Sequence, residues 1–209
     1  YLLGECHNLL KDYKKAELSF LAALPGLGKP ESTECHYRLG ITRFVLEKYD
    51  DSIKDLSIYL QDEPEGKHAK EATFYIARGY LESKEYDSAG SSFATLAKGE
   101  GPIAARSCLW QARVFTRSVK NYDKAAEILT DALERFSESD IVTDIRYDLA
   151  NSLMGKKSPD WQSALTLLIE VGKDNEFSQL AELLNQKSVC QHRLADYESS
   201  LASTVEFIK

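Results

Sequence analysis

The chain has 209 residues, of which 43% are hydrophobic and 28% are charged, a balance typical of a folded chain rather than a disordered one. No apolar stretch approaches the roughly 20 residues needed to span a bilayer. The formal net charge of −7 argues against a general nucleic-acid binder, which needs a basic surface to displace counterions.

The four cysteines form no C-x-x-C pair. They are typical of small buried hydrophobic residues rather than of a disulfide framework. This usage favours a reducing compartment.

An aromatic residue followed by two mostly polar residues and a small one recurs along the chain. The six segments are Tyr13-Lys-Lys-Ala16, Tyr49-Asp-Asp-Ser52, Tyr86-Asp-Ser-Ala89, Tyr122-Asp-Lys-Ala125, Trp161-Gln-Ser-Ala164 and Tyr197-Glu-Ser-Ser200. Their aromatic residues are 36, 37, 36, 39 and 36 positions apart. Six matches in phase indicate an internal repeat.

Helical patterns flank these segments. Apolar residues three or four positions apart follow the aromatics, as in 53–60, and similar stripes precede them over 35–46, 72–81 and 145–153. No segment alternates with period two for the length of a strand. The sequence therefore predicts about six antiparallel helix pairs.

Prolines mark two of the predicted helix starts. Pro102 and Pro159 suit a first helical position, where the missing N–H costs nothing, and Ser158 is predicted to act as an N-cap.

This pattern resembles the tetratricopeptide repeat family, which has a small residue midway along the first helix (A) of each pair, an aromatic near the turn, and a small residue on the second helix (B). The helix A position is filled by Gly40, Ala77, Ala112 and Ala150. The helix B position is filled by Ala16, Ala89, Ala125 and Ala164. Pro64 fits the closing proline of the family, whereas Ser52, Ser188 and Ser200 depart from its pattern at small positions.

The resemblance covers essentially the whole chain and implies an all-α, right-handed superhelical solenoid of about six antiparallel helix pairs, with helix A lining the concave face. We expect a single domain over residues 1–209, with repeats at approximately 1–30, 31–66, 67–101, 102–138, 139–173 and 174–209. Because both ends leave repeats incomplete, we expect the chain to be a fragment of a longer array.

The repeat is a few residues longer than the family's usual length. In this respect the chain is similar to bacterial cell-envelope members, namely the periplasmic partner of the Tol-Pal system and outer-membrane assembly lipoproteins. That similarity implies a location in the periplasm or cell envelope, with the cytoplasm as the alternative.

A Glu-Cys-His sequence occurs twice, at residues 5–7 and 34–36, and raises the question of a shared metal ion. The two copies are 29 positions apart, whereas repeat-equivalent positions are about 36 apart. The offset of seven residues is about 10 Å along a helix, and neighbouring helix axes are a further 8–10 Å apart. Zinc ligands must lie within about 2.3 Å of the ion, so we expect no metal site and no cofactor.

Motifs that carry catalysis are also missing from the sequence. There is no Gly-x-Ser-x-Gly, no His-Glu-x-x-His and no phosphate-binding glycine loop after a strand. Asp and Glu pairs such as Asp50-Asp51 fall at predicted turns and helix starts, where they complement the helix dipole. We predict that the chain is not an enzyme.

The predicted binding surface follows from the resemblance, which implies that residues three before and one after the helix A small position face inward. The candidate ligand-binding residues are Tyr37, Phe74, Arg78, Trp110, Arg113 and Tyr147, with Tyr75 and Arg106 beside them. Aromatic faces provide contact area and arginine provides bidentate hydrogen bonds to carboxylate, so the set suits a peptide with apolar anchors and an acidic group. The alternative is that the aromatics pack between helices and the arginines pair with nearby acids.

Three functional classes stay open. The first is a non-catalytic scaffold that binds a peptide or partner protein in the concave groove, with neither nucleic acid nor membrane insertion involved. The second is structural self-association through the terminal repeats, suggested by the apolar segment 201–208. The third is a regulatory or targeting module of a larger protein. A chaperone-tail adaptor is disfavoured, because the positions of the family's Lys/Asn/Asn/Lys/Arg clamp hold Tyr1, Glu5, Arg38, Glu71 and Tyr75.

Overall fold

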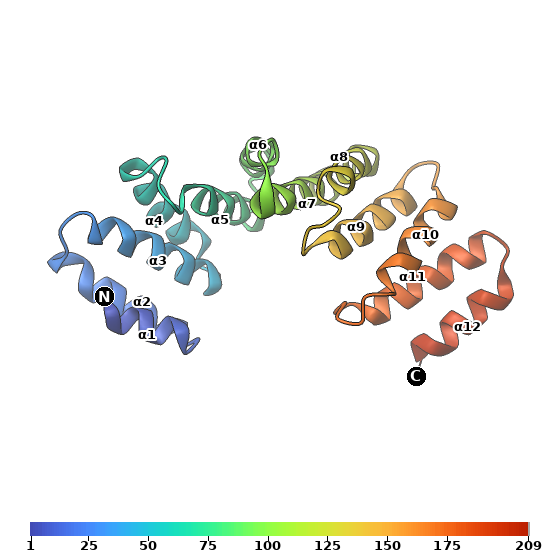
Figure 1. The fold of residues 1–209 in the computed structure, drawn as a ribbon, viewed down its shortest axis with the longest axis horizontal. Coiled ribbons are helices and arrows are strands. Elements are labelled where there is room, and N and C mark those ends of the chain that lie inside the picture. The colour runs from blue at the N-terminus through green and yellow to red at the C-terminus, as the bar shows by residue number, and fades with distance from the viewer. Residues whose placement is uncertain (209) are drawn as a thin grey trace. The chain divides into compact units, whose positions relative to one another are not determined.

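The computed structural model describes residues 1–208, which form twelve α-helices, one short 3-10 helix and no strand (Figure 1). The helices are α1 (Leu2–Leu9), α2 (Tyr13–Ala23), α3 (Glu31–Val45), α4 (Tyr49–Asp62), α5 (Ala69–Glu82), α6 (Tyr86–Ala97), α7 (Gly101–Ser118), α8 (Tyr122–Arg135), α9 (Val142–Gly155), α10 (Trp161–Val171), α11 (Leu180–Arg193) and α12 (Tyr197–Ile208), and the 3-10 helix is η1 (Leu24–Gly26). No helix within residues 1–208 combines the length and apolar character needed to cross a membrane.

The helices pack as consecutive antiparallel pairs, α1 with α2 through α11 with α12, which confirms the six predicted pairs. Their contacts gather in two compact units, Tyr1–Lys98 with the first three pairs and the part from Gly99 onward with the last three. Within each unit, the second helix of a pair also packs on the first helix of the next pair. A single domain with a right-handed superhelix over 1–209 stays a prediction.

The turns inside the hairpins share one backbone feature. A residue with φ between 51° and 65° stands two positions before the aromatic residue that begins the second helix, and these residues are Lys11, Glu47, Lys84, Lys120 and Ala195. The left-handed conformation reverses the chain at the end of the first helix, a position that usually favours glycine. The fifth turn, over 156–160, is two residues longer than the others, which explains why Tyr122 and Trp161 are 39 positions apart where Tyr49 and Tyr86 are 37 apart.

The N-caps of the second helices differ in part from the prediction. Helix α10 begins at Trp161, and the Asp160 carboxylate accepts a hydrogen bond from the Ser163 N–H at 3.0 Å. The prediction that Pro159 begins this helix with Ser158 as its N-cap is therefore wrong, because the chain already contains a better cap next to the aromatic. Pro102 does lie in the first turn of α7.

Small residues allow the helices of a pair to approach closely. A Cβ placed on Gly4 would lie 2.6 Å from Cδ1 of Phe20, and one on Gly40 would lie 2.6 Å from Cγ of Leu56. Two of the serines that depart from the family pattern are also at close contacts between paired helices, where their hydroxyl groups form hydrogen bonds. The Ser52 hydroxyl donates to the Gly40 carbonyl at 2.8 Å, and the Ser200 hydroxyl donates to the Ser188 carbonyl at 3.0 Å.

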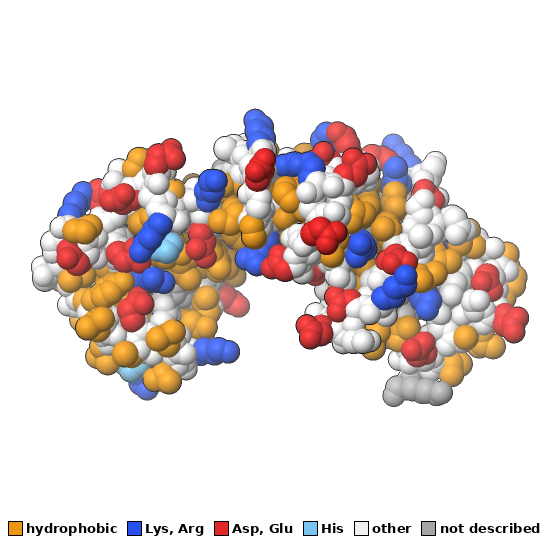
Figure 2. All heavy atoms as spheres, viewed as in Figure 1, with side chains coloured by type: hydrophobic (Ala, Val, Ile, Leu, Met, Phe, Trp, Pro, Cys, Tyr) orange, Lys and Arg blue, Asp and Glu red, His pale blue; other side chains and the backbone are white. Residues whose placement is uncertain are grey.

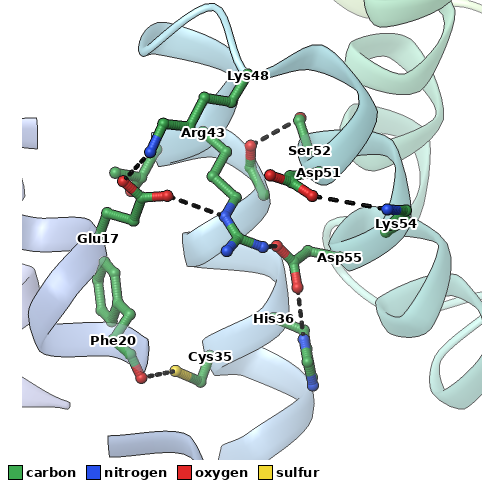
Figure 3. A network of polar contacts seen from close by, with 12 residues as sticks. Glu17, Phe20, Cys35, His36, Arg43, Lys48, Asp51, Ser52, Lys54 and Asp55 are labelled. Carbon is green, nitrogen blue, oxygen red and sulfur yellow. Dashed lines mark hydrogen bonds and ion pairs between the residues drawn. The ribbon is translucent and has the colours of Figure 1, made fainter. Parts of the chain in front are cut away.

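A buried ionic network joins the first two hairpins (Figure 3). Arg43 on α3 contacts Glu17 of α2 at 3.2 Å and Asp55 of α4 at 2.6 Å. Lys48 adds a second ion pair to Glu17 at 2.6 Å, and His36 Nδ1 lies 2.9 Å from an Asp55 oxygen. Burial alone would raise the pKa of Glu17, but the hydrogen bonds from Lys48 and Arg43 outweigh it and hold that pKa below its usual value.

Candidate functional site

In four of the first helices, α3, α5, α7 and α9, buried residues lie at the same positions relative to the small residue. The position three before it is buried in α3, α5, α7 and α9, whereas the positions two before and one after it are partly exposed in the same helices. The repeat therefore reserves one position for the core and leaves two positions accessible to a partner.

Three of the predicted binding residues occupy the buried position. Tyr37 stacks on the His68 ring at 4.0 Å between centroids, and Phe74 packs edge-on against Phe93 at 5.7 Å. Tyr147 accepts a hydrogen bond from Gln186 Nε2 at 2.9 Å. These aromatics fill the space between helices, as the alternative interpretation of the sequence proposed, and offer little surface to a ligand.

In the unit Tyr1–Lys98, the accessible positions carry charges that are already paired. Arg38 on α3 lies 3.4 Å from a Glu5 oxygen on α1 and 3.1 Å from a Glu34 oxygen on its own helix. Arg78 on α5 lies over the Phe44 ring, 5.3 Å from its centroid, and 3.7 Å from Glu82. This surface mixes both signs of charge within short distances.

In the unit from Gly99 onward, one face of α7 carries arginines and a tryptophan and no acidic residue. Arg106, Trp110, Arg113 and Arg117 follow one another at intervals of four, three and four residues, which places them on one face of the helix. The guanidinium carbon of Arg113 lies 4.6 Å from the Trp110 ring centroid and that of Arg117 lies 5.7 Å from it. We call these four residues the α7 stripe.

Carboxylates of the next hairpin face the α7 stripe. An Asp148 oxygen on α9 accepts from Arg113 Nε at 2.6 Å, and an Asp140 oxygen accepts from Arg106 at 3.1 Å. Asp144 lies between these acids on the chain and is half-buried. Burial raises the pKa of its carboxyl group, and the negative charges of Asp148 and Asp140 add to that rise while Arg113 opposes it.

A cavity of about 380 Å³ opens beside the α7 stripe. Its lining comes from α7, α8, α9 and the residue before α11, and includes Arg113, Thr116, Arg117, Tyr147, Asp148, Asn151 and Gln179. The cavity combines guanidinium groups, amides and two tyrosine rings, which are groups that recognise carboxylates and peptide backbones.

The structure thus brings Arg113 and Tyr147 together around one cavity, with Tyr147 contributing as a buried wall. Trp110 does not line this cavity, but its ring lies against Arg113, which does. Tyr37, Phe74 and Arg78 belong to the other unit. Sequence reasoning missed Arg117 and the two paired aspartates. The spacing of Arg106, Trp110, Arg113 and Arg117 was the signal that could have identified the first of these.

The cysteines and histidines are placed as follows. Cys6 is exposed, whereas the Cys35 thiol is buried and donates to the Phe20 carbonyl at 3.7 Å. Burial raises the pKa of Cys35 to about 11, so its thiol is not poised as a nucleophile. Within residues 1–208, no group of three or more His, Cys, Asp or Glu side chains is arranged to hold a metal ion.

No protein-family sequence model matches the chain, and no curated protein matches it in sequence. Solved structures do resemble it. MamA (residues 41 to the end) from Desulfovibrio magneticus RS-1 has a TM-score of 0.66 at 11% identity, covering 84% of this chain and 93% of that one. A tetratricopeptide repeat protein from Parabacteroides merdae ATCC 43184 has a TM-score of 0.67 at 17% identity, covering 98% and 75%.

YrrB, described as a tetratricopeptide repeat protein with an unusual peptide-binding site, has a TM-score of 0.64 at 15% identity, covering 90% of both chains. Identities this low establish the fold alone. The chain has the tetratricopeptide-like fold of consecutive helical hairpins, as the repeat pattern predicted.

Proposed function

We propose that this chain is a non-catalytic scaffold that binds a peptide or partner protein on the face formed by the first helices of its hairpins. The observation that carries the proposal is the α7 stripe, which places a tryptophan between arginines, two of which, Arg113 and Arg117, line a cavity of about 380 Å³. Tryptophan and arginine are the residues most enriched among those that dominate binding energy at protein interfaces.

The fold supports the same conclusion. Helical repeats of this kind use their extended surfaces for binding, and one protein of similar structure, YrrB, is described as having a peptide-binding site. The accessible positions of the first helices differ in chemistry from hairpin to hairpin while the buried positions keep apolar or small residues. Such variation on a constant frame is typical of a recognition surface.

The test is a pull-down with the intact protein, followed by identification of what it retains. Trp110→Ala and Arg113→Ala should each weaken retention at least tenfold, which is the effect of losing about 1.4 kcal/mol of binding energy. Arg135→Ala is the matched control, because Arg135 lies on the second helix α8 and pairs with exposed Asp131 at 3.0 Å. Unchanged retention by both α7 variants, with circular dichroism showing an intact fold, would refute the proposal.

A second candidate function is self-association, favoured by a repeat-equivalent acceptor surface on the last hairpin. His192 and Tyr197 make a ring contact at 5.3 Å, in the positions where Phe44 and Tyr49 make one at 5.4 Å. The Phe44 ring also contacts Tyr75 of the following hairpin at 5.0 Å. In a self-associated form, a hairpin of another copy would pack on His192 in the equivalent way.

The surfaces suited to this second function are apolar. Tyr197 is 62% exposed and Leu201 is 66% exposed, and hydrophobic side chains also gather on the surface over α1 and α2 (Figure 2). If copies associate through these surfaces, sedimentation will depend on concentration and Leu201→Asp will abolish that dependence. Monomers at every concentration would exclude self-association without affecting the scaffold proposal.

The similarity of the repeat length to cell-envelope members favours a location in the periplasm or cell envelope, whereas the four free cysteines favour the reducing cytoplasm. Fractionation of the native cells tests this directly. Recovery of the protein in the cytoplasmic fraction would select the alternative location.

A further inference from the structure

We infer that the α7 stripe recognises an acidic segment of a partner polypeptide, and that Asp148 is a built-in competitor which the partner's carboxylate must displace from Arg113. The inference rests on the proposed scaffold function and specifies the chemistry of its ligand. It identifies Asp148 as a residue that sets the affinity for the ligand.

The specificity for carboxylates follows from the groups that the arginines already bind. Arg113 and Arg106 are each paired with an aspartate that comes from beyond the second helix of their own hairpin, at 2.6 Å and 3.1 Å. A guanidinium group carries five N–H donors in a fixed plane, and the bond to Asp148 engages Nε. A ligand carboxylate of the same geometry can therefore replace Asp148 at Arg113.

The two ion pairs differ in how easily they exchange. Asp140 is 61% exposed, and an exposed ion pair contributes little because water and salt screen it. Asp148 is only 17% exposed, and the Arg113 side chain is 25% exposed. The Arg113–Asp148 pair is thus screened less by water, and its rupture is the larger obstacle to a ligand.

Trp110 supplies the second half of the recognition surface. Two guanidinium groups lie within 6 Å of its ring centroid, so they are held against the aromatic face and keep their planes oriented. The partly exposed ring offers apolar contact to an aliphatic or aromatic side chain next to the ligand's carboxylate. Asn151 and Gln179, which line the cavity, provide amide groups suited to hydrogen bonds with an extended backbone.

A polypeptide fits this surface better than a nucleic acid does. Asp140, Asp144 and Asp148 stand directly beside the arginines, and the whole chain carries a net charge of −7. A phosphate backbone would bring a regular row of negative charges against these acids, whereas a peptide can place one or two carboxylates at the arginines and neutral residues elsewhere.

The test uses the intact protein with an array of twelve-residue peptides, each containing one phenylalanine and two glutamates, together with the same peptides carrying glutamine in place of glutamate. The glutamate peptides should bind at least tenfold more tightly than their glutamine counterparts. Asp148→Asn should raise that affinity about three- to tenfold, and Arg113→Gln should lower it at least tenfold. Asp140→Asn should give a smaller rise, because its pair is more exposed.

Asp131→Asn is the control for the change in net charge, because Asp131 also pairs with an arginine of this unit, Arg135, at 3.0 Å on α8. It should leave peptide affinity unchanged. If Asp148→Asn and Asp131→Asn behave alike, or if glutamine peptides bind as well as glutamate peptides, the inference fails. Tighter binding of duplex DNA than of any peptide would also overturn it.

These outcomes are separable from failure of the scaffold function. Peptides that bind without regard to charge, but are lost in Trp110→Ala, would remove the acidic specificity and leave the scaffold intact. If no peptide binds and partner retention is unaffected by Trp110→Ala, the scaffold proposal itself fails.

Discussion

The ionic network around Arg43 predicts a large difference between two substitutions that look alike in sequence. Arg43→Met removes the cation between Glu17 and Asp55, and Lys54→Met removes the cation beside Asp51 on the neighbouring helix (Figure 3). The two acids differ in burial, because the Asp55 side chain is 6% exposed and the Asp51 side chain is 50% exposed. The burial of the acid decides the size of the effect.

The size of the loss in unfolding free energy depends on the partners that each carboxylate retains after the substitution. Removing one partner of a buried ion pair costs about 3–5 kcal/mol, because the remaining charge stays desolvated. Glu17 retains Lys48 at 2.6 Å and Asp55 retains His36 at 2.9 Å, so we expect Arg43→Met to destabilise by an amount near the lower end, about 3 kcal/mol. Lys54→Met should cost no more than about 1 kcal/mol, the usual contribution of an exposed pair.

Urea unfolding followed by circular dichroism measures both variants. Trp110 and Trp161 lie in the other unit, so tryptophan fluorescence reports there and tests whether the loss is confined to the first unit. The double variant Arg43→Met/Asp55→Leu should lose less than the sum of its single changes, because the uncompensated carboxylate is gone. Equal losses in Arg43→Met and Lys54→Met, or additive losses in the double variant, would refute the reasoning.

Three further predictions concern stability. Ala195→Gly should stabilise the protein by about 0.5–1 kcal/mol, because glycine adopts the left-handed conformation at φ 63° without steric strain. The same change at exposed Ala202 inside α12 should destabilise it by about 1 kcal/mol. Equal shifts of the two variants on thermal unfolding would contradict the backbone explanation. Gly40→Ala should destabilise by about 1–2 kcal/mol through the clash with Leu56, and adding Leu56→Val should recover part of the loss in urea unfolding rather than deepen it. Burial raises the folded-state pKa of Asp144, so the stability gained from its protonation is present at low pH and lost as pH rises. Asp144→Asn should therefore unfold at a higher temperature than the natural chain at pH 7 and lose that advantage below the ordinary pKa of Asp144, 3.8. Equal unfolding temperatures at pH 7 would count against the assignment.

The sequence was sufficient for the hairpins because their signal is repeated. Six aromatic-to-small segments in phase predict the second helices, and small residues such as Gly40 mark where paired helices touch. The fifth turn was the exception. There, extra residues around Pro159 offered more than one helix start, and only the bond from Ser163 to Asp160 selects between them.

The binding face was harder to predict because side-chain direction within a helix changes sharply over one residue. Phe74 and Tyr75 are neighbours, yet Phe74 is buried against Phe93 and Tyr75 is partly exposed. An aromatic at either position satisfies the same periodic pattern. Pairings such as Arg113 with Asp148 join residues 35 positions apart, and no local pattern reports them.

The accessible chemistry is repeated in two consecutive hairpins, and the difference between them argues for α7 as the recognition helix. Helix α5 carries Tyr75 and Arg78 where α7 carries Trp110 and Arg113. One turn later, however, α5 has an acid, Glu82, and this acid lies 3.7 Å from Arg78 on the same helix.

The equivalent position on α7 is Arg117, whose guanidinium carbon lies 5.7 Å from the Trp110 ring centroid, while that of Arg113 lies 4.6 Å from it. Helix α5 therefore pairs Arg78 with an acid of its own helix, while α7 pairs Arg106 and Arg113 with aspartates from beyond its own hairpin. A charge balanced from a neighbouring element can be exchanged for a partner's carboxylate without disturbing the helix that carries it. That is the property a binding surface needs, and it is why the decisive comparison is between Asp148→Asn and Asp131→Asn.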